Sequence, residues 1–235
     1  MEVYSAPYTV RSRDVNMFCH MRLSQMMELM QEAATDHSEA LGAGISDLRK
    51  RGLMWVLARQ YMEIDRLPLY AEQITVETWP VRTVHSLYPR YYRILDGKGD
   101  AIVNSSSVWM LADAEKRTSV TSAVSGVSFD AEARGFELPL SKPRPSNRAD
   151  RAYSFSVPFS YTDLNGHMNN TRYFDLADDL SPFSKEGIDP KKVFIEYSSE
   201  LLPGNEYQVF FGSECDRFVI AEGTEKHAFQ IVFEY

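Results

Sequence analysis

Apolar residues recur at helical spacing early in the chain. They form a stripe at intervals of three or four residues, made up of Met26, Met30, Ala33, His37 and Leu41. Acidic residues lie off this stripe, as expected for the solvent-facing side of an amphipathic helix. The pattern predicts a long helix that starts near Ser24, a candidate N-cap, and ends at Gly42 or Gly44.

Strand-like patterns come before and after this helix. A short strand is predicted at residues 8–12, and four longer ones at 54–65, 73–81, 88–95 and 101–112. Turn signals separate the longer strands, notably Asp96-Gly97. One helix followed by an antiparallel meander predicts an α+β layer with the sheet wrapped on the helix.

The pattern fades after residue 122 and then starts again. Residues 123–150 are rich in Ser, Pro, Lys and Arg and are predicted to be a linker. A strand at 153–158 and a helix at 170–180 follow, and further strands are predicted at 192–200, 207–215, 217–222 and 226–234. The sequence therefore predicts two domains, residues 1–122 and 151–235.

Matched landmarks in the two halves indicate a tandem duplication. The segment Asp14 to Met21 resembles Asp163 to Met168, with two extra residues in the first copy. Asp65-Arg66-Leu67-Pro68 likewise matches Glu200-Leu201-Leu202-Pro203. The alternative is a chance match of common turn residues, but the landmarks occur in the same order across strand, turn, helix and sheet.

Composition narrows the class of protein. The chain has 235 residues, 44% of them hydrophobic and 25% charged, which is ordinary for a soluble globular protein. The net charge of -8 argues against nucleic acid as a partner. No apolar run reaches the roughly 18 residues of a membrane span, and no secretory signal is seen. With only Cys19 and Cys215 as cysteines, we expect a cytoplasmic protein without disulfides.

The candidate chemistry lies in the turn before the second helix. Asp163, Asn165 and His167 stand at alternate positions there, so a tight turn brings a carboxylate, an amide and an imidazole together. Free backbone N–H groups at the helix start are expected to help stabilise an oxyanion. Asp163 is expected to accept backbone N–H bonds and support the turn. The plain alternative is that these residues only cap the helix.

Glu200 is the expected partner of His167. It is predicted at the end of a strand, where alternation places it on one face with Glu196 and Ser198. A carboxylate in reach of an imidazole can deprotonate a water molecule. Alternatively, Glu196 and Glu200 are only the solvated face of a strand.

Other catalytic chemistries lack their motifs. No serine stands in a G-x-S-x-G elbow, and no Gly-rich loop is placed to hold phosphate. His167 has no second His or Cys at a metal-ligand spacing. We therefore expect neither a metal nor a cofactor.

The chain resembles the acyl-acyl carrier protein (acyl-ACP) thioesterases of plants and bacteria over almost its full length. The matching segments are Met26–Gly42, Met54–Arg59, Val76–Trp79, Ser105–Trp109, Asp163–Asn170 and Glu196–Glu200. The resemblance implies a tandem double hotdog fold and hydrolysis of long- or medium-chain acyl-ACP to free fatty acid. It also implies catalytic roles for Asp163, Asn165, His167 and Glu200.

One departure from the family narrows the mechanism. Plant members often have Cys directly after the strand glutamate, and this chain has Leu201. A cysteine nucleophile at that position is thus excluded, which leaves water activated by Glu200 and His167. The transit peptide of the plant enzymes is not seen, which favours a bacterial origin. An acyl-CoA thioesterase and a non-catalytic acyl-ligand-binding protein remain alternatives.

Substrate and carrier contacts are expected in two places. Met26 and Met30, with Trp55, are expected to line the acyl-binding site, although plain core packing explains the methionines equally well. Arg144, Arg148 and Arg151 are expected to dock the acidic carrier protein, although a solvated linker is the alternative. Since a double hotdog can close its own interface, a homodimer is left open.

Overall fold

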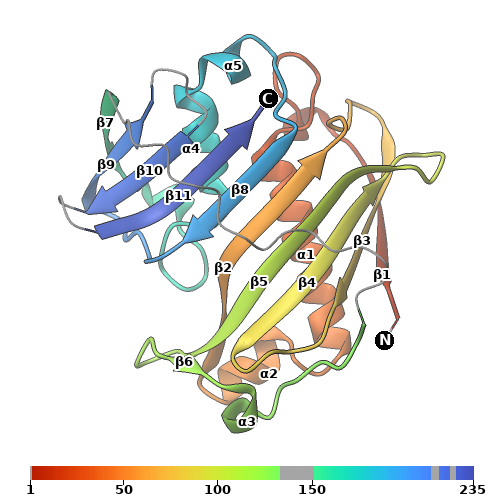
Figure 1. Cartoon of the computed structure of the whole chain (residues 1–235), viewed down its shortest axis with the longest axis vertical. Coiled ribbons are helices and arrows are strands. Elements are labelled where there is room, and N and C mark those ends of the chain that lie inside the picture. The colour runs from red at the N-terminus through yellow and green to blue at the C-terminus, as the bar shows by residue number, and fades with distance from the viewer. Residues whose placement is uncertain (1, 133–150, 213–216, 223–225) are drawn as a thin grey trace. The chain divides into compact units, whose positions relative to one another are not determined.

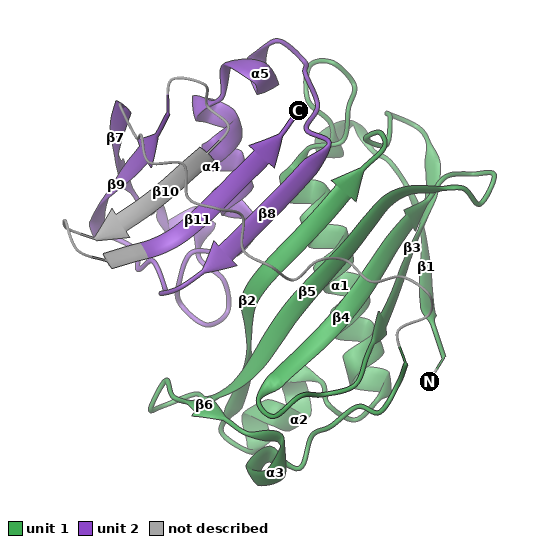
Figure 2. Cartoon of the chain, viewed as in Figure 1, with its two compact units in different colours: residues 1–140 green, residues 141–235 purple. Residues whose placement is uncertain are grey.

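The computed structural model of the protein describes residues 2–132, 151–212, 217–222 and 226–235. The chain forms two compact units, Met1–Leu140 and Ser141–Tyr235 (Figure 2). No helix in the described part of the chain is long and apolar enough to cross a membrane.

Unit 1 is an antiparallel sheet packed on one long helix, α1 (Leu23–Ala40) (Figure 1). Its sheet has the order β1-β3-β4-β5-β2, with the short β6 paired to β5. The strands are β1 (Tyr4–Thr9), β2 (Leu53–Ile64), β3 (Gln73–Pro80), β4 (Leu87–Leu95), β5 (Ala101–Asp113) and β6 (Ser119–Val120). Short helices α2 (Ile45–Lys50) and α3 (Ser122–Ser125) and a 3-10 turn, η1 (Ser12–Asp14), complete the unit.

The predicted stripe is the buried face of α1. Met26 and Met30 are fully buried, and Ala33 and His37 are nearly so. Side chains at helical spacing lie on one face of a helix, so packing this face against the sheet buries all of them together. Their burial stabilises the contact between helix and sheet. The expected N-cap is wrong: the helix starts after Arg22, and Ser24 lies inside it, buried.

Unit 2 repeats this arrangement with a shorter helix, α4 (Arg172–Leu180). Its sheet has the order β7-β9-β10-β11-β8. The strands are β7 (Arg151–Ser156), β8 (Lys192–Tyr197), β9 (Glu206–Phe211), β10 (Arg217–Glu222) and β11 (Lys226–Glu234). A 3-10 turn, η2 (Phe159–Tyr161), precedes α4, and a short helix, α5 (Pro182–Lys185), follows it.

The strand orders of the two units correspond one to one, which confirms the predicted duplication. Register agrees as well: Thr9 pairs with Gln73 at the start of β3, and Ser156 pairs with Glu206 at the start of β9. Each half is thus a sheet wrapped on a helix, the hotdog arrangement implied by the resemblance.

The beginning of the predicted linker packs onto unit 1. Val127 and Phe129 are buried in a cluster with Leu48 and Tyr88. Backbone N–H groups of Arg82 and Thr83 donate to carbonyl oxygens of this stretch. Residues 133–150 of the predicted linker, and with them Arg144 and Arg148, lie outside the described residues.

Candidate active site

The turn that precedes α4 is held closed by Asp163. One of its carboxylate oxygens accepts the N–H of Asn165 at 2.8 Å and that of His167 at 3.4 Å. The Asp163 N–H donates to the His167 carbonyl oxygen at 2.9 Å, which closes the loop. Gly166 sits at φ +84°, a conformation that glycine adopts without strain. Asp163 thus makes the backbone contacts predicted for it.

Glu200 meets His167 although it is not on a strand. β8 ends at Tyr197, so Glu200 lies in the loop beyond the strand, contrary to the prediction. The N–H of Met168 donates to the carbonyl oxygen of Leu201 at 2.8 Å and ties this loop to the turn. As a result, Nε2 of His167 lies 3.1 Å from a Glu200 carboxylate oxygen, while Nδ1 lies 3.7 Å from Asp163. The His167 side chain is 13% exposed and that of Glu200 36%.

Three N–H groups at the start of α4, a place where we expected free ones, are bonded within the protein. The side-chain oxygen of Asn169 accepts the N–H of Thr171, and its carbonyl oxygen accepts that of Arg172. Phe174 donates to the Thr171 carbonyl oxygen. Within the residues that the structure describes, the side-chain amide of Asn165 has no hydrogen-bond partner. Among the expected oxyanion donors, this amide is therefore available to a ligand.

Unit 1 contains the same turn, and its register corrects the predicted match. The side-chain oxygen of Asn16 accepts the N–H groups of Phe18 at 3.0 Å and His20 at 3.2 Å, as Asp163 does two and four residues on. Asn16, and not Asp14, is thus the counterpart of Asp163. No residues are inserted: Cys19, at φ +65°, takes the place of Gly166. In this register His20 matches His167.

The rest of the candidate site is absent from unit 1. Met21 donates to the carbonyl oxygen of Pro68 at 2.8 Å, the bond that Met168 makes to Leu201, so the counterpart of Glu200 is the buried Leu67. The predicted match of Asp65 with Glu200 is therefore wrong by two residues. The counterpart of Asn165 is Phe18. Unit 1 thus has a histidine, His20, at the position of His167 and an amide, Asn16, at the position of Asp163.

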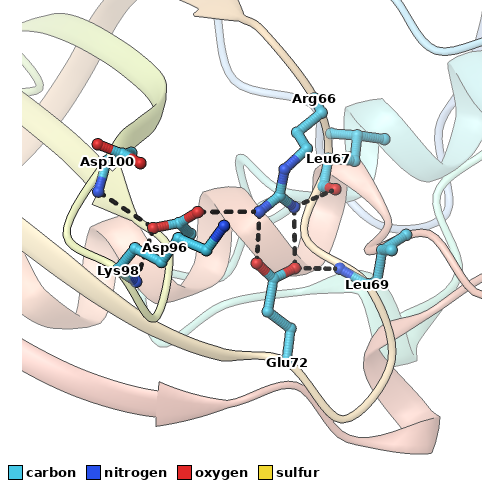
Figure 3. Close-up of polar contacts among 7 residues, drawn as sticks. All are labelled: Arg66, Leu67, Leu69, Glu72, Asp96, Lys98 and Asp100. Carbon is cyan, nitrogen blue, oxygen red and sulfur yellow. Dashed lines mark hydrogen bonds and ion pairs between the residues drawn. The ribbon is translucent and has the colours of Figure 1, made fainter.

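Ion pairs hold the corresponding loop in unit 1 (Figure 3). The guanidinium of Arg66 binds both oxygens of Glu72, at 2.9 and 2.6 Å, and lies 3.5 Å from Asp96. Arg66 is the largest cause that lowers the pKa of Glu72. A Glu72 oxygen also accepts the N–H of Leu69 at 2.8 Å.

Tyrosine hydroxyls hold the loop that carries Glu200 in unit 2, a feature that the sequence did not predict. The Tyr207 hydroxyl accepts the N–H of Leu202 at 2.8 Å. The Leu201 N–H donates to the hydroxyl of Tyr173, whose pKa is raised mainly by burial. In the correct register of the repeat, Tyr173 and Tyr207 of unit 2 match Met26 and Ile74 of unit 1, which have no hydroxyl. This difference between the two units is the sequence signal that could have identified both tyrosines.

The expected acyl-binding residues are part of the packing of unit 1. Met30 accepts a contact of 3.8 Å from the Gln60 amide, and both it and Met26 are fully buried. The indole N–H of Trp55 donates to the Ala43 carbonyl oxygen at 2.9 Å. Of the basic residues expected to dock the carrier, the described one is Arg151, which is exposed at the start of β7.

Comparison with known families decides the assignment. Residues 1–124 match the acyl-ACP thioesterase N-terminal domain, and residues 145–232 match the acyl-ACP thioesterase C-terminal domain. The chain belongs to the acyl-ACP thioesterase family. Asp163, Asn165, His167 and Glu200 all fall in the part that matches the C-terminal domain.

The family's plant members are distant in sequence. The palmitoyl-acyl carrier protein thioesterase of Arabidopsis thaliana, a chloroplastic protein, is 24% identical over 84% of this chain and 52% of its own length. The dodecanoyl-acyl carrier protein hydrolase of Cinnamomum camphora is 24% identical over 77% of this chain and 52% of its own. The chain thus spans about half the length of these curated relatives.

Solved structures confirm the fold of this acyl-ACP thioesterase family member. An acyl-ACP thioesterase from Bacteroides thetaiotaomicron superposes with a TM-score of 0.84 at 21% identity, covering 99% of this chain and 98% of that one. The 12:0-ACP thioesterase of Umbellularia californica gives 0.79 at 20% identity, covering 99% and 96%. At such low identities the likeness shows a shared double hotdog fold and nothing finer.

Proposed function

We propose that the protein hydrolyses fatty acyl-ACP thioesters to free fatty acid and carrier protein, as a step of fatty acid biosynthesis. The observation that carries the proposal is the 3.1 Å contact between His167 and Glu200. The turn that holds His167 also carries Asn165, whose side-chain amide has no partner among the described residues. Family membership supports the substrate class.

In the proposed reaction the Glu200 carboxylate removes a proton from water. His167 orients that carboxylate, a general-base arrangement that contributes roughly 10²- to 10⁴-fold. The water oxygen bonds to the thioester carbonyl carbon while the Asn165 amide donates to the oxygen that becomes negative. The C–S bond then breaks, and the proton taken from water returns through His167 to the sulfur. Asp163 keeps the turn in shape and does not react.

Leu201 supports water over a protein nucleophile at the neighbouring position. Its side chain is fully buried and carries no reactive group. A covalent acyl-enzyme formed on the residue after Glu200 is therefore not part of the proposal.

We also propose that the acyl chain packs along the side of α1 that carries Met26 and Met30, near Trp55. Flexible methionine side chains can rearrange around an aliphatic chain, which supports this placement. Replacing Met30 by Leu or Trp55 by Phe should change the chain-length preference, measured across a series of acyl-ACP substrates. An unchanged preference in folded variants would leave these residues with core packing alone.

The carrier is proposed to dock through basic residues, among them Arg144, Arg148 and Arg151. An acidic carrier approaching a chain of net charge -8 needs local positive charge, which supports the assignment. Replacing the three arginines by Glu should raise KM for acyl-ACP and weaken its dependence on salt. If the salt dependence of kcat/KM stays as it is, the carrier docks elsewhere.

One kinetic comparison separates this function from its rivals. The same acyl chain is presented to the purified protein on ACP and on coenzyme A, and kcat/KM is measured for each. The proposal predicts a clear preference for the ACP thioester. A preference for the CoA thioester would make the protein an acyl-CoA thioesterase, and binding without turnover of either would make it an acyl-ligand-binding protein.

A further inference from the structure

We propose that Tyr207 and Tyr173 are positioning residues that fix the loop carrying Glu200 so that its carboxylate meets His167. The inference rests on the proposed function, since it gives the two hydroxyls a role in that same site. It adds two residues that touch neither substrate nor the reacting water.

The contacts converge on the two residues that follow Glu200. The Tyr207 hydroxyl accepts the Leu202 N–H at 2.8 Å and the Asn205 amide at 3.4 Å. The Tyr173 hydroxyl accepts the Leu201 N–H, and the Leu201 carbonyl oxygen accepts from Met168 at 2.8 Å. An unpaired backbone group in a buried loop costs free energy, so these hydrogen bonds favour the observed conformation of the loop. Both residues after Glu200 are therefore tethered from their backbones.

Both tyrosines are anchored in the core of unit 2, so the tether is rigid. Tyr173 and Tyr207 are 3% and 2% exposed. The ring of Tyr173 packs against Phe229 at 4.3 Å between centroids and edge-on against Tyr197 at 5.3 Å. Burial raises the pKa of Tyr173, and nearby Tyr207, Asp163 and Glu200 raise it further. Its hydroxyl therefore stays protonated and neutral around neutral pH.

Unit 1 acts as an internal comparison because it has the same loop without the glutamate. The counterparts of Tyr173 and Tyr207 are Met26 and Ile74, which have no hydroxyl. There the N–H of Leu69, the counterpart of Leu202, is held by the carboxylate of Glu72. The hydroxyl pair thus occurs in the unit that has Glu200 and is missing from the unit that has Leu67.

Charge explains why the two units use different groups. In unit 1 the negative charge of Glu72 is balanced by Arg66 (Figure 3). Unit 2 has Ser199 at the position of Arg66 and Asn205 at that of Glu72. A second carboxylate there would repel the charge of Glu200 and compete for His167, whereas a phenol accepts the same N–H bond without adding charge.

The test is a double-mutant cycle between Tyr207→Phe and Glu200→Gln, with acyl-ACP as substrate. Tyr207→Phe should lower kcat about 10-fold and leave KM unchanged, because it loosens the geometry of the base and not the binding of substrate. In the Glu200→Gln background the same change should have no further effect on kcat, since no base is left to position. Tyr173→Phe should behave in the same way.

Tyr88→Phe is the matched control, as it removes a buried hydroxyl that donates to the backbone of Val127 in unit 1. It should alter the melting temperature without altering kcat. Amide hydrogen exchange at Leu201 and Leu202 gives a readout that does not need turnover, and exchange should speed up in Tyr207→Phe. Normal kcat in Tyr207→Phe would overturn the proposal. The proposal would also fail if Tyr207→Phe lowered kcat as much in the Glu200→Gln background as in the wild type. If the wild-type protein proves inactive on acyl-ACP, the proposed function fails, and faster exchange would still establish the tether.

Discussion

Asp163 accepts a hydrogen bond of 2.8 Å from the backbone N–H of Asn165. In unit 1, Asn16 uses its amide oxygen to make the equivalent bond to Phe18. The turn thus needs an oxygen at this position and not a charge. We predict that Asp163→Asn changes the free energy of unfolding by less than about 1 kcal/mol, whereas Asp163→Ala lowers it by about 2 kcal/mol because two backbone N–H groups lose their acceptor. Urea denaturation of the two variants measures the difference. Equal losses would show that the charge holds the turn.

Asn165 is predicted to act in the transition state. Its side-chain amide is unpaired among the described residues, although its own backbone N–H is bonded to Asp163. Asn165→Ala should reduce kcat about 10²- to 10³-fold with little change in KM, as expected when one oxyanion donor is removed. Steady-state kinetics on acyl-ACP will measure both constants. A rise in KM at constant kcat would instead place Asn165 in substrate binding.

His20 is predicted to be dispensable for turnover. It occupies the position of His167 in unit 1, but Leu67 stands where the partner carboxylate would be. Because no carboxylate occupies the position of Glu200 in unit 1, the arrangement proposed to activate water in unit 2 is not repeated at that position. His20→Ala should therefore keep kcat within about twofold, whereas His167→Ala should lose about 10² or more. A large loss in a folded His20→Ala protein would contradict the assignment of chemistry to unit 2.

Stability is predicted to depend on pH through His37. Burial, and then the charge of Arg90 with its Nη1 3.3 Å from the ring, lowers the pKa of His37 to about 4 from an ordinary value of 6.5. Between these values the unfolded chain binds the extra proton, so stability is full above pH 6.5 and falls as the pH drops toward 4. From pH 7.5 to pH 5 the free energy of unfolding should fall by about 2 kcal/mol more in the wild type than in His37→Gln. Equal losses in both proteins would mean that another group is responsible.

Periodicity was enough to predict the helices and strands that carry the site. Burial on one side gives α1 its apolar stripe, and burial of every second side chain gives the strands their alternating pattern. The bounds of these elements agree with the predicted ones to within a few residues. The sequence also predicts the contact between Glu200 and His167, although it predicts Glu200 on the strand and the structure has it in the loop beyond. The strand ends earlier, at Tyr197, because the N–H groups of Ser198 and Ser199 both donate to Ala228 and leave the regular ladder.

The register of the duplication could not be predicted by matching letters. Matching letters pairs Asp14 with Asp163, because both are aspartates, whereas the shared property is the side-chain oxygen that Asn16 provides. The match of Cys19 with Gly166 is also not visible in the sequence. Both residues adopt a positive φ, but a glycine suggests this conformation and a cysteine does not. For the same reason Tyr173 and Tyr207 were missed: their importance follows from backbone partners that composition and spacing do not reveal.

Glu200 gives the most direct test of the proposed mechanism. The measurement is kcat on acyl-ACP for Glu200→Gln, with Glu196→Gln, a substitution of the same kind on β8, as the matched control. We predict that Glu200→Gln lowers kcat by about 10²- to 10⁴-fold at unchanged melting temperature, and that Glu196→Gln stays near the wild type. Near-normal turnover in a folded Glu200→Gln protein would contradict water activation by Glu200 and His167.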